Sequence, residues 1–159
     1  MNKYIQQALL AMGVLLTSAC ALAEATVSYV NPGKMTDVPR NGRDRESMQA
    51  ALLEHFNALS ARLPAGQQLK VDIVDIDLAG DVFPRVAIQH VRVMKGRADY
   101  PRIDLRYSIE QDGKVISSGE RSLTDTNYLT SFNRYSSDLY AHEKQLLDDW
   151  FRKELIAVR

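Results

Sequence analysis

An alternating segment followed by a two-residue turn constrains this chain more than any other feature. Four apolar residues alternate with polar ones within residues 102–109, namely Ile103, Leu105, Tyr107 and Ile109. Because side chains of a strand point alternately to opposite faces, this pattern predicts a strand with one buried and one solvated face. The dipeptide Asp112-Gly113 suits the left-handed conformations of a tight hairpin turn. Residues 114–123 are therefore expected to return as an antiparallel strand.

The rest of the chain supplies two long helices and further strands. Residues 46–63 carry an apolar stripe at steps of three and four, which predicts a helix, and residues 139–155 carry a broader one. Strands are expected at 27–30, 69–78 and 87–94. Within 69–78 the alternation changes phase at Ile73-Val74, which indicates a β-bulge or a strand covered on both faces. After Asp125, the helical spacing of Tyr128, Phe132 and Tyr135 predicts a short additional helix.

These elements follow the order β-α-β-β-β-β-α. That order predicts an α+β fold, in which a mainly antiparallel sheet of four to five strands carries two main helices on one face. We found no repeats, low-complexity tracts or linkers, so residues 24–159 are expected to form a single domain.

The first 23 residues resemble a cleavable export signal. Lys3 precedes a short apolar run at residues 8–16, and the small-residue site Ala21-Leu22-Ala23 predicts cleavage before Glu24. A run this short does not span a bilayer, so the mature chain is expected to be periplasmic and not membrane-spanning. The minority alternative is a lipoprotein anchored through Cys20, although the leucine of a lipobox stands three places before its cysteine and Leu16 stands four before.

Composition excludes several classes of protein. Basic and acidic side chains are equal in number, 20 of each, so the basic excess of a nucleic-acid-binding protein is missing. Cys20 is the single cysteine, and its loss with the signal would leave neither disulfides nor thiolate chemistry. The sequence has no H-E-x-x-H, G-x-S-x-G or phosphate-binding glycine loop. We therefore expect no metal site, no cofactor and no catalytic residues.

A group of carboxylates supports an alternative hypothesis, that of a small hydrolase or metal-dependent enzyme. Asp75 and Asp77 lie two residues apart on an expected strand, and Gly80 could turn Asp81 back toward them. Such oxygens are able to bind Ca²⁺ or to act as an acid and base pair. The same residues also fit the solvated face and end of a strand.

Glu143 breaks the pattern of its own helix, because it falls within the apolar arc of residues 139–155. A buried carboxylate needs a partner or a proton, so we expect Glu143 to pair with an arginine and to fix the position of the helix. Arg102, Arg106 and Arg134 are the candidates, and Arg106 is the predicted partner. A role in a functional cleft is the alternative.

Rings, amides and a guanidinium gather before the last helix. Aromatic faces beside amides suit a glycan or an extended peptide, although aromatic residues at helical spacing also occur in cores. The candidate binding residues are Asn127, Tyr128, Arg134, Tyr135 and Tyr140.

Several segments together resemble a known family: VSYVNPGKMTDV (27–38), DIDLAGD (75–81), YPRIDLRY (100–107), LTDTNY (123–128) and EKQLLDDWFRKEL (143–155). They are similar to the DUF3016 family, small exported proteobacterial proteins with a domain of unknown function. The resemblance implies an envelope location and a single domain, and it implies no activity, cofactor or catalytic residue. Residues 82–96 depart from the pattern, so the resemblance says nothing of a site there.

Because no acid, base and nucleophile stand together, we expect a non-catalytic binding or accessory domain. Its partner is expected to be a protein or a glycan of the cell envelope, with no role for nucleic acid. The sequence leaves open the identity of the ligand, the physiological role and the oligomeric state.

Overall fold

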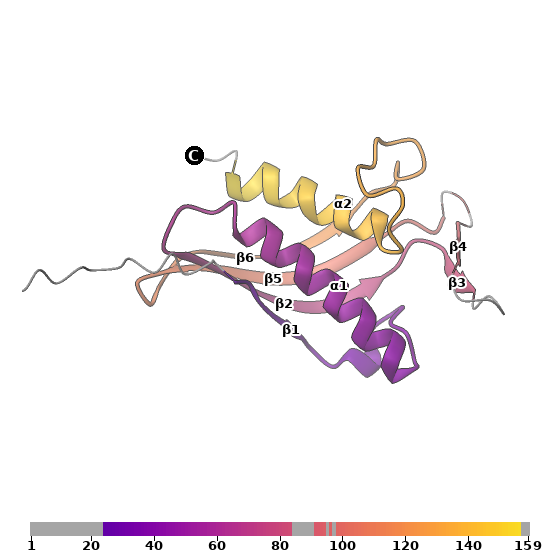
Figure 1. The fold of residues 1–159 in the computed structure, drawn as a ribbon, viewed down its shortest axis with the longest axis horizontal. Coiled ribbons are helices and arrows are strands. Elements are labelled where there is room, and N and C mark those ends of the chain that lie inside the picture. Colours follow the sequence, from indigo (N-terminus) through magenta and orange to yellow (C-terminus); the bar gives the residue numbers. More distant parts are fainter. Residues whose placement is uncertain (1–23, 84–90, 95, 97, 157–159) are drawn as a thin grey trace, which may run out of the picture.

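Four strands form the main sheet, in the spatial order β1-β2-β5-β6 (Figure 1). They are β1 (Thr26–Tyr29), β2 (Gln67–Asp77), β5 (Arg102–Gln111) and β6 (Lys114–Thr124). The computed structural model describes residues 24–83, 91–94, 96 and 98–156. The predicted export signal, residues 1–23, lies outside the described residues.

The sheet is mixed, because β1 runs parallel to β2 whereas β2, β5 and β6 pair antiparallel. The parallel pair follows from the chain order: the helix α1 (Gly42–Ser60) crosses back between β1 and β2 and returns the chain to the same end of the sheet. The predicted α+β fold with a mainly antiparallel sheet is thus confirmed, with one parallel pair at its edge.

The predicted hairpin and bulge are both present. Asp112 and Gly113 adopt positive φ angles of 52° and 74° at the turn between β5 and β6. The pairing of β2 with β5 shifts between Ile73 and Asp75, so that Val74 is the extra residue. This bulge is the reason the alternation of β2 changes phase.

A separate two-stranded ribbon contains β3 (Asp81–Phe83) and β4 (Val91–Val93). The sequence predicts one strand at 87–94 and no strand at 81–83. The described part of that expected strand is β4, and residues 84–90 lie outside the described residues. Gly80 is essential to the start of the ribbon, because its φ is +68° and a Cβ there would overlap the backbone of Val93.

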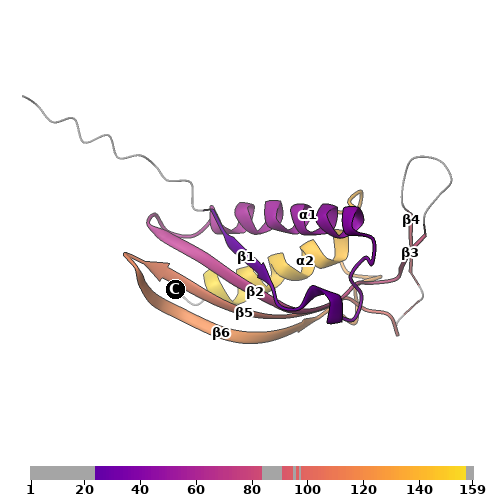
Figure 2. The ribbon, with the colours of Figure 1, turned by 90° about the horizontal axis from the view of Figure 1, so that it is seen from below.

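Both long helices cover the same face of the sheet (Figure 2). The helix α1 begins at Gly42, four residues before the predicted start, because the Asn41 side chain caps it by accepting a hydrogen bond from the Arg43 amide at 2.9 Å. The second helix is α2 (Ala141–Trp150), which continues as the π-helical turn η2 (Phe151–Ile156). Among the described residues, no helix has the length and apolar character needed to cross a membrane.

The prediction of a short helix after Asp125 is wrong, because residues 125–140 form a series of turns. Asp125, Asn133 and Asp138 each accept a hydrogen bond from the backbone amide two residues later. Such local bonds between a side chain and the backbone compete with helix formation. They override the helical spacing of the aromatic residues.

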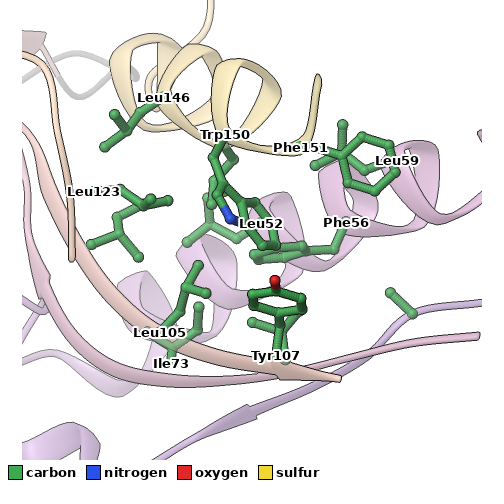
Figure 3. Close-up of a cluster of buried hydrophobic side chains, with 14 of the residues drawn as sticks. Leu52, Phe56, Leu59, Ile73, Leu105, Tyr107, Leu123, Leu146, Trp150 and Phe151 are labelled. Atoms are coloured by element: carbon green, nitrogen blue, oxygen red, sulfur yellow. The ribbon is translucent and has the colours of Figure 1, made fainter. Parts of the chain in front are cut away.

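The core lies between the two helices and the sheet (Figure 3). Leu52 and Phe56 of α1 meet Trp150 and Phe151 of the second helix over the sheet, where Tyr107 packs edge-on against Trp150 at 5.3 Å between ring centroids. The opposite face of the sheet is polar and carries the ion pairs Lys70–Glu110 and Arg106–Asp72. One face therefore builds the core, and the other stays in contact with solvent.

Candidate functional site

A pocket of about 1050 Å³ lies where the segment before α1 meets the start of that helix and the end of β2. The segment includes the short 3₁₀ turn η1 (Pro32–Lys34) and lies at the end of the molecule that carries the β3–β4 ribbon (Figures 1 and 2). The pocket is lined by Pro32, Gly33, Met35, Thr36, Asp37, Val38, Pro39, Arg40, Asn41, Arg43, Asp44, Arg45, Ser47, Leu78, Asp81, Leu139 and Tyr140.

Hydrogen bonds to β2 hold the wall of this pocket in place. The Thr36 amide and hydroxyl donate to the two oxygens of Asp75 at 2.7 and 2.6 Å. The Asp37 amide donates to the Ile76 carbonyl at 2.8 Å. The segment is thereby fixed at two successive residues to the bulged end of β2.

Charged groups of both signs line the pocket. Arg40, Arg43 and Arg45, which we call the arginine triad, come from the N-cap region and first turn of α1. Burial raises the pKa of Asp37, and the charges of Asp77 and Asp81 raise it further, although Arg92 acts in the opposite direction. The environment therefore disfavours the charged form of Asp37.

Arg102 lies within ion-pair distance of two residues of the predicted acidic group. The Arg102 Nη2 lies 2.9 Å from Asp75 and 4.0 Å from Asp77. Partial burial opposes the ionisation of Asp75, but the hydrogen bonds from Thr36 and the charge of Arg102 outweigh it and lower the pKa. For Asp77, burial raises the pKa despite the opposing effect of Arg102.

Asp81 lies apart from this ion-pair group, at the start of β3, where it lines the pocket and has interaction partners of its own. Within the part of the chain that the structure describes, no three His, Cys, Asp or Glu side chains are arranged to hold a metal ion. The structure therefore divides the three predicted acidic residues between an arginine-bound pair and the pocket wall.

Glu143 is fully buried, with 0% of its surface exposed. One carboxylate oxygen accepts a hydrogen bond from the Ala79 amide at 3.0 Å, and the other accepts from Arg92 Nη1 at 2.8 Å. The prediction that Arg106 is the partner of Glu143 is wrong, because Arg106 lies near Asp72 on the polar face of the sheet. Arg92 is 5% exposed and also donates to the Leu139 carbonyl, so the pair joins β4 to the start of α2.

The five predicted binding residues do not form one surface. Tyr128 and Tyr140 are buried, and the Tyr128 hydroxyl donates to the Gly96 carbonyl at 3.0 Å. Arg134 pairs with Asp148 at 3.0 Å, and Tyr135 packs edge-on against His55 at 5.2 Å between ring centroids. Asn127 is exposed and accepts backbone hydrogen bonds in its own turn. Of the five, Tyr140 alone reaches the pocket.

A second cluster of ionisable groups lies between the helices. Burial lowers the pKa of His55 to about 4, although the nearby Asp148 acts in the opposite direction. Asp148 itself is 5% exposed and is bound by Arg62 at 2.8 Å and Arg134 at 3.0 Å. This cluster ties α1, α2 and the 125–140 turns together, so its role is structural.

The sequence analysis missed Arg92 and the arginine triad. The signal for the triad was present, because three arginines occur within six residues of a polar stretch, RNGRDR. For Arg92 no local signal exists, since it stands between two valines in a strand of three residues.

Comparisons with known proteins agree with the resemblance seen in the sequence. No curated protein and no solved structure matches the chain. A family model described as a protein of unknown function, DUF3016, matches residues 23–153. The chain therefore belongs to the DUF3016 family.

Proposed function

We propose that this protein is an exported, periplasmic binding domain without catalytic activity, and that the pocket beside α1 binds a protein or polymer of the cell envelope. The observation that carries the proposal is that two carboxylates near the pocket are already bound within the protein, whereas the charged side chains of the pocket line an open space. The carboxylates of Asp75 and Glu143 are each bound by an arginine and by a backbone amide. The pocket beside them remains open and lined by charged side chains.

Export is supported by the predicted signal sequence. The site Ala21-Leu22-Ala23 predicts a mature chain that starts at Glu24. The intact mass of protein recovered from the periplasm measures this directly. A diacylglyceryl group on Cys20 would instead place the protein on a membrane and contradict the cleavage we propose.

One observation favours the alternative of a small hydrolase. Asp37 lines the pocket with a raised pKa, and perturbed carboxyl groups in clefts are typical of catalytic acids. Asp81 lines the same pocket. If Asp37→Asn abolished turnover of an envelope polymer by the purified protein, this alternative would replace the binding role.

Site-specific crosslinking tests the binding role. A photoreactive residue at Ser47, which is exposed and lines the pocket, is expected to capture an envelope component in cells. The matched control is the same residue at Gln68, which is exposed on the opposite, polar face of β2. Equal capture from both positions would show that the pocket is not the binding site.

A further inference from the structure

The arginine triad differs from the other arginines of the described residues in having no ion-pair partner there. Seven arginines form ion pairs with carboxylates: Arg62, Arg92, Arg102, Arg106, Arg121, Arg134 and Arg152. Within the same described ranges, Arg40, Arg43 and Arg45 pair with none. All three of these unpaired arginines line the one pocket described above.

Three carboxylates, those of Asp37, Asp44 and Asp81, line the same pocket, and the triad forms no ion pair with them among the described residues. Asp44 and Asp81 each have an interaction of their own. Asp37 lies in surroundings that raise its pKa, with burial as the main cause. Three guanidinium groups from six consecutive residues line one pocket, and their positive charge would attract an anion.

We propose that the arginine triad binds a phosphate group of the envelope ligand, an inference that rests on the proposed binding function and names its chemistry. A phosphate monoester carries a charge of about −1.5 to −2 at pH 7 and three acceptor oxygens. Guanidinium forks match these oxygens with paired hydrogen bonds. A single carboxylate supplies one charge and two oxygens, so it satisfies fewer of the donors that the triad offers.

The other residues that line the pocket fit the part of the ligand to which the phosphate is attached. Asn41 and Ser47 supply an amide and a hydroxyl near the triad, and Asp37 is able to accept a hydrogen bond from a hydroxyl. Met35, Val38 and Leu139 add apolar side chains to the lining. A phosphorylated sugar or glycerol unit combines these features, because it has both hydroxyl groups and a carbon framework.

Isothermal titration of the purified exported protein tests this proposal at low ionic strength in a phosphate-free buffer. The probes are inorganic phosphate, glycerol 3-phosphate, hexose 1-phosphate and, as the carboxylate arm, glucuronate. We expect the phosphate esters to bind, and glucuronate to bind at least about tenfold more weakly, a difference of about 1.4 kcal/mol. Raised salt should weaken binding, because screening acts on exposed charges.

Two variants with the same change in net charge distinguish binding at the triad from non-specific electrostatic attraction of the phosphate ester to the protein. The triad variant replaces all three pocket arginines with Gln and should lose at least about tenfold in affinity for the phosphate esters. The control variant carries Arg106→Gln, Lys114→Gln and Arg152→Gln, none of which lines the pocket, and should change affinity by less than about twofold. If the triad variant fails to fold, Arg40→Gln alone should still weaken binding, since Arg40 is exposed.

Each contrary result has a distinct meaning. Equal weakening in the triad and control variants, or equal binding of glucuronate and the phosphate esters, would overturn the phosphate site. Capture from Ser47 without any phosphate binding would overturn the ligand chemistry and leave the binding function in place. Absence of both capture and phosphate binding would overturn the two proposals together.

Discussion

The charges between α2 and its neighbours contrast with the charges in the segment before α1. At α2, Glu143 meets Arg92 and Asp148 meets two arginines, and both carboxylates are buried. In the segment before α1, the arginine triad lines an open pocket and has no partner among the described residues. Charges of the first kind fix one element against another, whereas charges of the second kind remain available to a ligand.

Burial explains why the two sets have different roles. A buried carboxylate left without its partner costs several kcal/mol, so Glu143 and Arg92 depend on each other. An exposed arginine loses little by having no partner, because water solvates it. The contrast therefore predicts large stability effects at α2 and small ones in the pocket.

The largest effect is expected for Glu143→Ala. Removing this carboxylate leaves Arg92, which is 5% exposed, and the Ala79 amide without their partner, so the free energy of unfolding should fall by about 3 to 5 kcal/mol. A urea titration followed by the fluorescence of Trp150, the single tryptophan, measures the change. Asp149→Ala is the matched control on the outer side of α2, expected to cost under about 0.5 kcal/mol. Equal midpoints for Glu143→Ala and the parent would show that the carboxylate is solvated.

The next effect is the dependence of stability on pH through His55. Burial lowers its pKa from the usual 6.5 to about 4 in the folded state, so the unfolded chain binds the proton first. The contribution of neutral His55 to the free energy of unfolding is complete above pH 6.5. It decreases by up to about 3 kcal/mol as the pH falls toward 4. Tyr135, Lys144, Asp138 and Asp148 surround the ring and are present in parent and variant alike.

His55→Leu provides the comparison, because it removes the titrating ring and keeps an apolar side chain. Urea midpoints of this variant should vary much less between pH 6.5 and pH 4 than those of the parent. The pKa of His142 is also lowered, mainly by burial, so a smaller slope of the same sign should persist. Identical slopes in parent and variant would exclude His55 as the source.

The sequence predicts features that depend on local pattern. Alternation and the Asp112-Gly113 turn predict the β5–β6 hairpin, and the phase change at Val74 predicts the bulge. The helical phase of residues 139–155 predicts that Glu143 faces inward, which the structure confirms. Each of these features is encoded within about a dozen residues, so tertiary contacts are not needed to recognise it.

Features that depend on distant contacts were beyond the same reasoning. Glu143 pairs with an arginine 51 positions away, and no local pattern separates Arg92 from Arg106 as that partner. The pocket joins the segment before α1 to Leu139 and Tyr140, which only the tertiary fold brings together. The expected aromatic surface is not formed, because Tyr128 and Tyr140 are buried. Local hydrogen bonds to the side chains of Asp125, Asn133 and Asp138 form turns in this part of the backbone, and the spacing of the aromatic residues does not reveal these turns.

Tyr128→Phe should lower the free energy of unfolding by about 1 kcal/mol, less than the changes at Glu143 and His55. It removes a buried hydroxyl that donates to the Gly96 carbonyl, and a typical net hydrogen bond contributes that much. Phe132, in the same series of turns, is 82% exposed, so Phe132→Ser should leave the urea midpoint unchanged. Loss of stability at Phe132 without loss at Tyr128 would reverse the assignment of core and surface in this region.

The smallest effect is expected for the triad variant, in which Arg40, Arg43 and Arg45 become Gln. No ion pair within the described residues is lost, so the free energy of unfolding should not fall by more than about 0.5 kcal/mol. Arg62→Gln is the matched single change at α2, because Arg62 binds the buried Asp148 and lies 5.2 Å from the centre of the Phe151 ring. It should lower stability by about 0.5 to 1 kcal/mol, since Arg62 is itself 41% exposed and partly screened by water. A larger loss in the triad variant than in Arg62→Gln would mean that the pocket arginines hold the fold together, and the contrast between the two regions would not stand.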